Sequence, residues 1–466
     1  MKLVGLNKKW IWIIIAFVLV RIIVFSSFWE ASADKGGWNN FYRQAQPVSA
    51  VMMKLFHDFC DWHPPLYYAF TSIILLIFNN QWFIYSAQIL LALLVVWLSY
   101  KIAKLFFSEK IAVISAFLVG IEPYWAWHNF LLVSENLFTP LFMAGFYYFF
   151  VFIKNSGRKH FYISAIFLGF ATLTRPNTVV IIPALLVLLL IIFFLKKKIK
   201  QEFVLNLSLK QFIFGFIIFN VIFFGIIFSW TIRNKMIYGQ ATLANILSTN
   251  FFFYNLPPLI SMQKNISYSQ AYGEIIDEAK KHLREPIDDQ GDCKVYSKEE
   301  FVARQDYYKN TSKDYIFGNL MSYVKVHLVK TMPFFFQSGY FEMWSAYSGE
   351  YSKPDITALI LKKDISAVKD FFKQVNAKLL FYILGMILWG TASFAAFFAV
   401  IYSYFKDREK FLLFLITFSI ILLNALLMAP FILARYRLPI NILFFIPLVY
   451  LFFEIVNYKF KPSIKE

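Results

Sequence analysis

Long apolar blocks alternate with short polar segments along most of the chain. A membrane-spanning helix needs about 20 mostly apolar residues. The blocks predict ten such spans, at residues 10–28, 84–106, 111–130, 136–153, 161–174, 176–195, 211–230, 377–403, 411–430 and 438–456. Residues 66–78 form a shorter apolar stretch, and stretches of about 10–14 residues are more typical of interfacial helices. We therefore predict an all-α polytopic membrane protein in which 64–80 lies along the membrane surface.

The distribution of lysine and arginine orients these spans. Basic clusters occur in alternate connecting segments, at 2–9, 101–110, 154–159, 196–210, 406–410 and 459–465. The short segments on the other side carry only Lys35, Arg43, Lys54, Arg175, Arg435 and Arg437. Short cytoplasmic loops carry an excess of Lys and Arg. The pattern thus predicts that both termini are cytoplasmic and that 66–78 does not cross, because a crossing there would place the later clusters outside.

This topology divides the chain into three parts. Residues 1–230 form a transmembrane module whose first outer loop is 29–83. Residues 231–376 are polar enough to form a mixed extracytoplasmic loop domain, and 377–466 hold the C-terminal membrane helices. We expect the protein in the cytoplasmic membrane, surrounded by membrane lipid.

Composition and charge exclude other classes. The chain is 59% hydrophobic and 16% charged, with a formal net charge of +18. The basic residues lie at the ends of apolar blocks, where lipid headgroups meet them, so we expect no nucleic-acid partner. The two cysteines, Cys60 and Cys293, provide neither a disulfide framework nor a CxxC metal motif. The basic, apolar start of the chain lacks a small-residue cleavage site, which favours a retained first span over a signal peptide.

Acidic residues follow the first span closely. Glu30 and Asp34 lie at its outer end, and His63 begins the sequence HPPLYY after Asp58 and Asp61. A carboxylate just above the membrane surface is placed to deprotonate an acceptor hydroxyl beside a sugar carried on a lipid phosphate. His63, followed by two prolines, is a candidate metal ligand or phosphate contact. The alternative is that these acids are solvated loop residues and that His63 only caps the next helix.

Glu135 stands in the sequence SEN where the third predicted span ends and the fourth begins. An acid so close to an apolar run is unfavourable unless it faces water or a partner. It also suits a helix N-terminus with Ser134 as the cap.

Arginines recur at the predicted outer ends of spans, at Arg175, Arg233, Arg435 and Arg437. The planar guanidinium binds two phosphate oxygens at once, so these residues are candidates to hold a donor phosphate. Contact with lipid headgroups is the alternative. Arg21, within the first span, needs a partner or must extend to the membrane surface.

Six short motifs in order resemble the GT-C glycosyltransferases, in the branch with protein O-mannosyltransferases and lipid A aminoarabinose transferases. They are DKGGW from Asp34, HPPLYY, SEN, LTRPN, WTIRN and RYRLP.

The resemblance implies an inverting transfer of a hexosyl or pentosyl group from a polyprenyl-phosphate sugar, on the extracytoplasmic face. It assigns Asp34 as the base or its partner and Glu135 as the second acid. His63 matches a metal-contacting position, which implies a divalent metal ion, and Arg233, Arg435 and Arg437 match positions suited to the phosphate. Lys35 stands where relatives commonly carry a further acid, and Glu30 is the candidate to replace it. The acceptor is a hydroxyl, or a phosphate, on a protein, lipid or glycan.

Three other functions fit a polytopic chain. A secondary transporter would be expected to show inverted repeats and midplane charges, which the sequence lacks. A flippase, ligase or polymerase for lipid-linked glycans would also need outer-face arginines. A non-catalytic assembly protein would tolerate loss of either acid.

Overall fold

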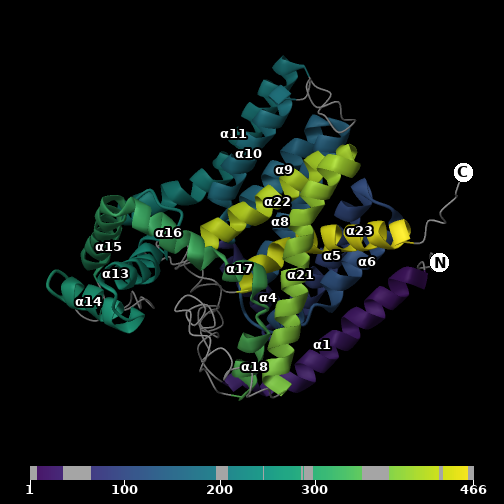
Figure 1. Cartoon of the computed structure of the whole chain (residues 1–466). Coiled ribbons are helices and arrows are strands. Elements are labelled where there is room, and N and C mark those ends of the chain that lie inside the picture. The colour runs from purple at the N-terminus through teal and green to yellow at the C-terminus, as the bar shows by residue number, and fades with distance from the viewer. Residues whose placement is uncertain are drawn as a thin grey trace, which may run out of the picture.

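The computed structural model describes residues 8–34, 64–195, 208–244, 246–284, 287, 297–348, 377–429 and 434–459. Every regular element in these ranges is a helix, and none of them contains a strand. Figure 1 shows long helices packed into a bundle, with a group of shorter helices, α13 to α15, projecting from one side.

The first half of the chain supplies nine helices within the described ranges. They are α1 (Lys8–Asp34), α4 (Leu66–Phe78), α5 (Trp82–Phe106), α6 (Glu109–Ile121), α7 (Pro123–His128), α8 (Glu135–Asn155), α9 (Arg158–Thr172), α10 (Thr178–Leu195) and α11 (Leu209–Tyr238). The third predicted span is broken between α6 and α7, because Glu122 is extended and Pro123 begins a new helix.

The second half begins with mostly short helices and ends with long apolar ones. The first group comprises α12 (Ile246–Asn250), the π-helical turn η1 (Phe251–Asn255), α13 (Leu256–Lys264), α14 (Tyr268–Lys280), the longer α15 (Lys298–Gly318), α16 (Leu320–Thr331), α17 (Pro333–Phe336) and α18 (Tyr340–Ser348). The chain then forms α21 (Ala377–Lys406), α22 (Arg408–Met428), the 3-10 helix η4 (Ala434–Ile440) and α23 (Asn441–Lys459).

Seven helices of the described residues are long and apolar enough to cross a membrane. They confirm the predicted all-α polytopic class, whereas the count of ten spans stays a prediction. The stretch predicted to be interfacial is α4, a 13-residue apolar helix.

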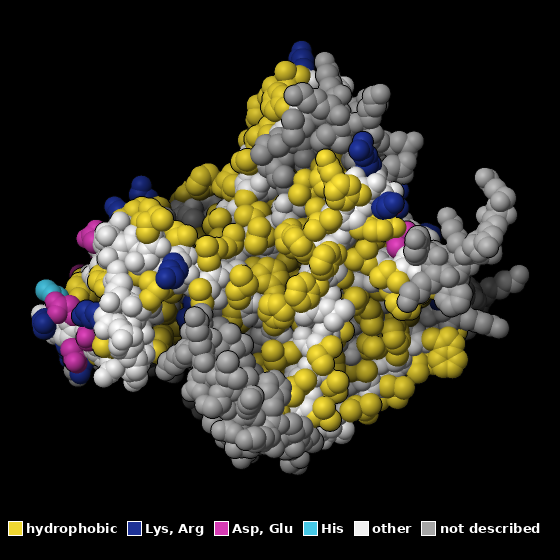
Figure 2. Space-filling model, in the orientation of Figure 1, with side chains coloured by type: hydrophobic (Ala, Val, Ile, Leu, Met, Phe, Trp, Pro, Cys, Tyr) yellow, Lys and Arg dark blue, Asp and Glu magenta, His cyan; other side chains and the backbone are white. Residues whose placement is uncertain are grey.

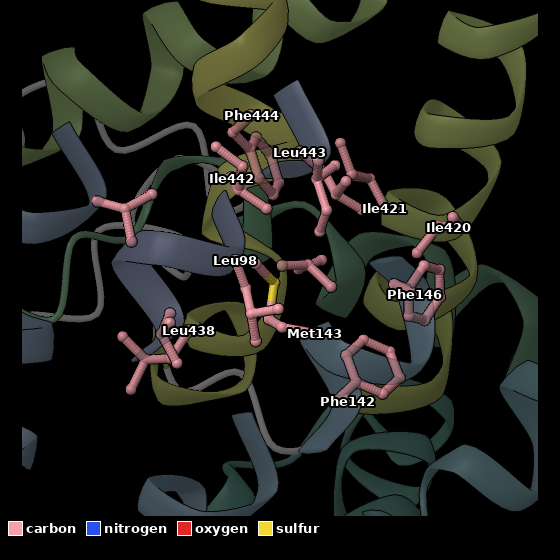
Figure 3. Close-up of a cluster of buried hydrophobic side chains, with 14 of the residues drawn as sticks. Leu98, Phe142, Met143, Phe146, Ile420, Ile421, Leu438, Ile442, Leu443 and Phe444 are labelled. Carbon is pink, nitrogen blue, oxygen red and sulfur yellow. The ribbon is translucent and has the colours of Figure 1, made fainter. Parts of the chain in front are cut away.

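The core of the bundle is built from aromatic and branched aliphatic side chains. Figure 3 shows side chains of α8, α22 and α23 meeting in this core, among them Phe142, Ile421 and Phe444. In the most apolar stretch of α8, 83% is buried inside the protein, compared with 22% in α1 and 28% in α11. Helix α8 is therefore central, and α1 and α11 lie at the periphery.

The outer surface of the long helices is apolar as well. Figure 2 shows hydrophobic side chains spread over the bundle, with the charged ones at its margins. On α11, side chains such as Val221 and Phe228 are exposed. Water-soluble monomers rarely expose such continuous apolar surface. We call this exposed surface of the long helices the apolar belt, and it is the part of the protein that contacts lipid.

Charged contacts mark one end of the bundle, which we call the lysine end. The ammonium of Lys104 lies 2.9 Å from Glu109 Oε2, and Lys154 donates to the carbonyl of Leu105. Lys410 pairs with Asp407, which also accepts a hydrogen bond from the Tyr450 hydroxyl. Four of the basic clusters used to orient the spans, those around 101–110, 154–159, 208–210 and 406–410, have their described residues at helix termini.

Arg21 has the partner that its place in the first span requires. Its Nε donates to Asn129 Oδ1 at 3.1 Å, and its Nη1 donates to the carbonyl of Gly120 at 2.7 Å. The guanidinium also stacks on the Phe17 ring, 3.4 Å from its centroid. The break between α6 and α7 exposes polar groups inside the bundle, and Arg21 uses them to join α1 to this region.

Helices α12 to α15 pack around a small core of their own. Phe252 stacks on Tyr308 with ring centroids 4.5 Å apart, and both side chains are buried. In the described part of 231–376, the segment predicted to form a mixed loop domain, all regular elements are thus helices.

The chain then returns to the bundle through α16, α17 and α18. Ser393 of α21 donates to the carbonyl of Phe335 at 2.7 Å. Gly339 has φ +77°, and a Cβ there would lie 2.7 Å from the Tyr124 ring. This turn between α17 and α18 therefore needs glycine both for its left-handed backbone and for the close approach of α7.

Replacing Gly339 with alanine should destabilise the protein by about 1–3 kcal/mol, because the residue would be strained and would displace Tyr124. Thermal unfolding in detergent measures the effect. Gly225→Ala is the matched control, since a Cβ there meets nothing within 4 Å and alanine favours a helix. Equal unfolding temperatures for the two variants would contradict this account of the turn.

Candidate active site

Glu135 is the first residue of α8 and is buried, with 2% of its surface exposed. The preceding segment, 129–134, is irregular and turns the chain from α7 into α8. Ser134 occupies the predicted N-cap position, but its side chain makes no capping hydrogen bond. Its hydroxyl lies 3.5 Å from Glu135 Oε2 instead. The first turn of a helix favours a carboxylate, but a buried charge also needs a direct partner.

Two arginines from distant parts of the chain provide that partner. Arg175 lies in the turn between α9 and α10, and its Nη1 pairs with Glu135 Oε1. Arg435 of η4 approaches the same oxygen, with Nε at 3.6 Å. Most of each side chain is buried, so the ion pairs are poorly screened by water. Together they join α8, the α9–α10 turn and η4.

The Tyr436 ring contacts both guanidinium groups. Its ring centroid is 5.0 Å from the Cζ atom of Arg175 and 5.1 Å from that of Arg435. Arg435 Nη2 also donates to the Tyr436 hydroxyl at 3.2 Å. On α22, the amide of Asn424 donates to the Tyr436 carbonyl at 2.9 Å and so fixes the backbone of η4.

These residues line a small pocket. Its wall combines the ionic groups with amides and apolar side chains, namely Glu135, Phe138, Phe142, Arg175, Asn177, Ile181, Asn424, Arg435, Tyr436, Pro439 and Ile440. We call the part of the bundle around this pocket the pocket end. Guanidinium and amide donors beside apolar walls suit an anionic group attached to an apolar chain.

A second buried polar cluster lies next to the pocket. Arg437 donates to the carbonyls of Phe334 and Gln337, each at 2.6 Å, and its Cζ lies 3.6 Å from the Trp389 ring centroid. Arg437 is 1% exposed. These contacts hold the α17–α18 turn against α21 and η4. The phosphate role predicted for Arg437 stays a prediction that these contacts do not favour.

Acidic residues that the sequence analysis did not select join this second cluster. Glu122, at the break between α6 and α7, is buried and accepts a hydrogen bond from the Trp125 amide at 2.6 Å. Glu342 of α18 accepts one from the Tyr124 hydroxyl. Glu122 had the same sequence signal as Glu135, an acid at the end of an apolar run. Glu342 stands in the aromatic stretch YFEMW of 231–376, but that segment was assigned to a domain outside the membrane, so the acid was not selected.

The structure thus brings together three of the predicted residues, Glu135, Arg175 and Arg435. Arg233 lies on α11, where it donates to Asn234 Oδ1 at 2.9 Å and packs on Trp230, and it does not line the pocket. Asp34 and Glu30 belong to the last turns of α1, but their side chains lie outside the described part of the structure.

The predicted metal ligands belong to the first outer loop and the end of α1. His63 lies outside the described residues, as does the side chain of Glu30. Among the residues that are described, no group of three or more His, Cys, Asp and Glu side chains is placed to hold a metal ion. A divalent metal therefore stays a prediction that rests on the first outer loop.

The fold and this pocket define a class, a multi-pass helical membrane protein with a buried acid–arginine pocket at one end of its bundle. Residues 62–223 match the family described as dolichyl-phosphate-mannose-protein mannosyltransferase. The match includes HPPLYY, SEN and LTRPN, and it confirms the resemblance to the GT-C glycosyltransferases. No curated protein matches the chain in sequence.

Solved structures of two membrane enzymes are similar to the chain. One is the archaeal oligosaccharyltransferase AglB from Archaeoglobus fulgidus, in complex with an inhibitory peptide and a dolichol-phosphate. It is 13% identical, with a TM-score of 0.46, over 96% of this chain and 51% of that one. The other is ArnT from Cupriavidus metallidurans bound to undecaprenyl phosphate, 12% identical, with a TM-score of 0.36, over 92% of this chain and 77% of that one. The chain thus spans about half the length of the oligosaccharyltransferase.

Replacing Glu135 with alanine should destabilise the protein by about 3–5 kcal/mol, because two buried arginines lose their counter-charge. Glu109→Ala removes the Lys104–Glu109 pair at the lysine end, where both side chains are more than one-third exposed, and should change stability by less than about 1 kcal/mol. Thermal unfolding of both variants in detergent checks the difference. Equal losses would show that the Glu135 pairs contribute no more than a surface ion pair.

Proposed function

We propose that this protein is a membrane glycosyltransferase that moves a sugar from a polyprenyl-phosphate carrier to an acceptor on the extracytoplasmic face. One observation carries the proposal: buried Glu135 fixes Arg175 and Arg435 in a pocket at the end of an apolar bundle. The family match over 62–223 supports it.

In this proposal, the pocket binds the phosphate of the donor. Guanidinium groups hold phosphate oxygens with two parallel hydrogen bonds, and their charge stabilises the phosphate as it leaves. Glu135 keeps both arginines in place, and Tyr436 limits their rotation by stacking. The polyprenyl chain then extends along the apolar outer surface of the bundle. Arg233 and Arg437 stay as further candidates from the sequence.

The chemical step follows from the groups assigned. The acceptor oxygen attacks the anomeric carbon from the face opposite the phosphate, while the carbon–oxygen bond to the phosphate breaks and the phosphate takes the electron pair. Configuration at the anomeric carbon is inverted. Asp34 accepts the proton from the acceptor hydroxyl. Its place in the last turn of α1 supports this role, because α1 packs against α7 and α18, the elements that border the pocket end.

The orientation is also proposed. The lysine end faces the cytoplasm, and the pocket end, with α12 to α15, faces outward. A group of helices with its own core at the pocket end suits the selection of a large acceptor, such as a protein, lipid or glycan.

Membranes containing the protein should transfer radiolabelled sugar from one member of a panel of polyprenyl-phosphate sugars. Asp34→Asn should abolish transfer, and Arg175→Gln should lower it on the order of 10²-fold by weakening charge stabilisation of the leaving phosphate. Arg158→Gln, at an exposed arginine of the lysine end, is the matched control and should leave transfer unchanged.

The panel experiment separates the proposal from its alternatives. Retained transfer in Asp34→Asn with loss in Arg175→Gln would favour a ligase or polymerase that depends on arginine. Consumption of no donor by the wild-type protein, in membranes where it is folded, would favour a transporter or an assembly protein.

Cysteine labelling in intact cells tests the orientation. In a chain with Cys60 and Cys293 replaced by serine, Lys309→Cys on α15 should react with a membrane-impermeant maleimide. Lys406→Cys at the lysine end should react only after the membrane is opened. The reverse pattern would place the pocket in the cytoplasm.

A further inference from the structure

Helix α16 connects the projecting helices to the bundle, and one of its faces is packed while another is exposed. It packs against α13 and against α22 (Figure 1). The Tyr323 hydroxyl donates to Asn255 Oδ1 at 3.0 Å, and His327 Nε2 lies 2.7 Å from the carbonyl of Leu426. The inward face of α16 thus links the helices after α11 to α22.

Next to this packed face, α16 carries an apolar and exposed face. Four exposed side chains follow one stripe of the helix, Leu320, Met321, Val324 and Leu328, and exposed Met332 directly follows the last residue of α16. Met321 is 83% exposed and Met332 is 59% exposed. A stripe with this spacing is expected to be covered by another apolar surface. Two lysines lie on α16: Lys325 is exposed and Lys330 is half-buried.

The position of α16 identifies what covers the stripe. His327 contacts α22 at Leu426, two residues before that helix ends, and Leu422 one turn earlier belongs to the exposed apolar belt. The stripe is therefore at the height where the lipid-facing surface of α22 ends. A helix at that level, with an apolar face outward and a lysine at its edge, fits the boundary between acyl chains and headgroups.

We propose that α16 is an interfacial helix whose apolar stripe is inserted into the bilayer leaflet at the pocket end. The bilayer, and not a protein partner, covers Met321 and Leu328. Since Asn424 lines the pocket from the same end of α22 that α16 contacts, the pocket wall is braced by an element held in the membrane surface. The inserted helix also fixes α12 to α15 at the membrane surface.

Spin-label accessibility in lipid nanodiscs tests this insertion. In the Cys60→Ser, Cys293→Ser chain, labels are attached at Met321→Cys and, separately, at Leu328→Cys. The lipid control is Val221→Cys in the exposed belt of α11, and the aqueous control is Lys309→Cys on α15. Each label is exposed to oxygen, which partitions into lipid, and to a nickel chelate, which stays in water.

Labels at Met321 and Leu328 should resemble Val221 more than Lys309, with oxygen access well above that at Lys309 and clearly less access to the nickel chelate. Access to the chelate equal to that at Lys309 would overturn the proposal, because the stripe would face water. Protection from both reagents would also overturn it, because a second copy of the chain or another protein would then cover the stripe. Elution of each labelled variant at the wild-type volume shows that the label has not disturbed the fold.

Discussion

A charged carboxylate buried in an apolar helix bundle needs cations or hydrogen-bond donors beside it, because water cannot solvate it there. In this protein the carboxylate is Glu135, and its cations come from positions 175 and 435, far apart in the chain. The requirement therefore fixes the start of α8, the α9–α10 turn and η4 relative to one another. The pocket exists because these segments meet at a charged point that apolar packing alone could not specify.

Two other buried arginines near the pocket are stabilised by backbone carbonyls and not by a carboxylate ion pair. Arg21 and Arg437 donate mainly to backbone carbonyls, at Gly120 for the first and at Phe334 and Gln337 for the second. Free carbonyls are present because helices are interrupted there, between α6 and α7 and after α17. Interrupted helices are tolerated at membrane depth where protein surrounds them. The pocket end is thus polar because its helices are broken, whereas the lysine end has long helices with solvated termini.

This contrast suits the proposed transfer from a lipid-linked donor. The phosphate needs cations at headgroup depth, and the carrier chain needs an apolar surface beside them. The pocket provides both, since its arginines and amides adjoin Phe138, Phe142 and Ile181. Placing α16 in the same leaflet puts donor, pocket and the projecting helices at one level.

The sequence by itself determined the helical membrane class, the two-sided charge distribution and three of the pocket residues. Hydrophobic block length and charge at block ends are local properties, so they can be read without tertiary contacts. Glu135, Arg175 and Arg435 were found because each is a charge beside an apolar run. Arg435 faces the pocket, whereas Arg437, two residues on, donates hydrogen bonds to backbone carbonyls. This difference could not be predicted, because it depends on the path of η4. The exposed stripe of α16 and the role of Glu342 likewise depend on which distant helices pack there, and only the tertiary structure decides that.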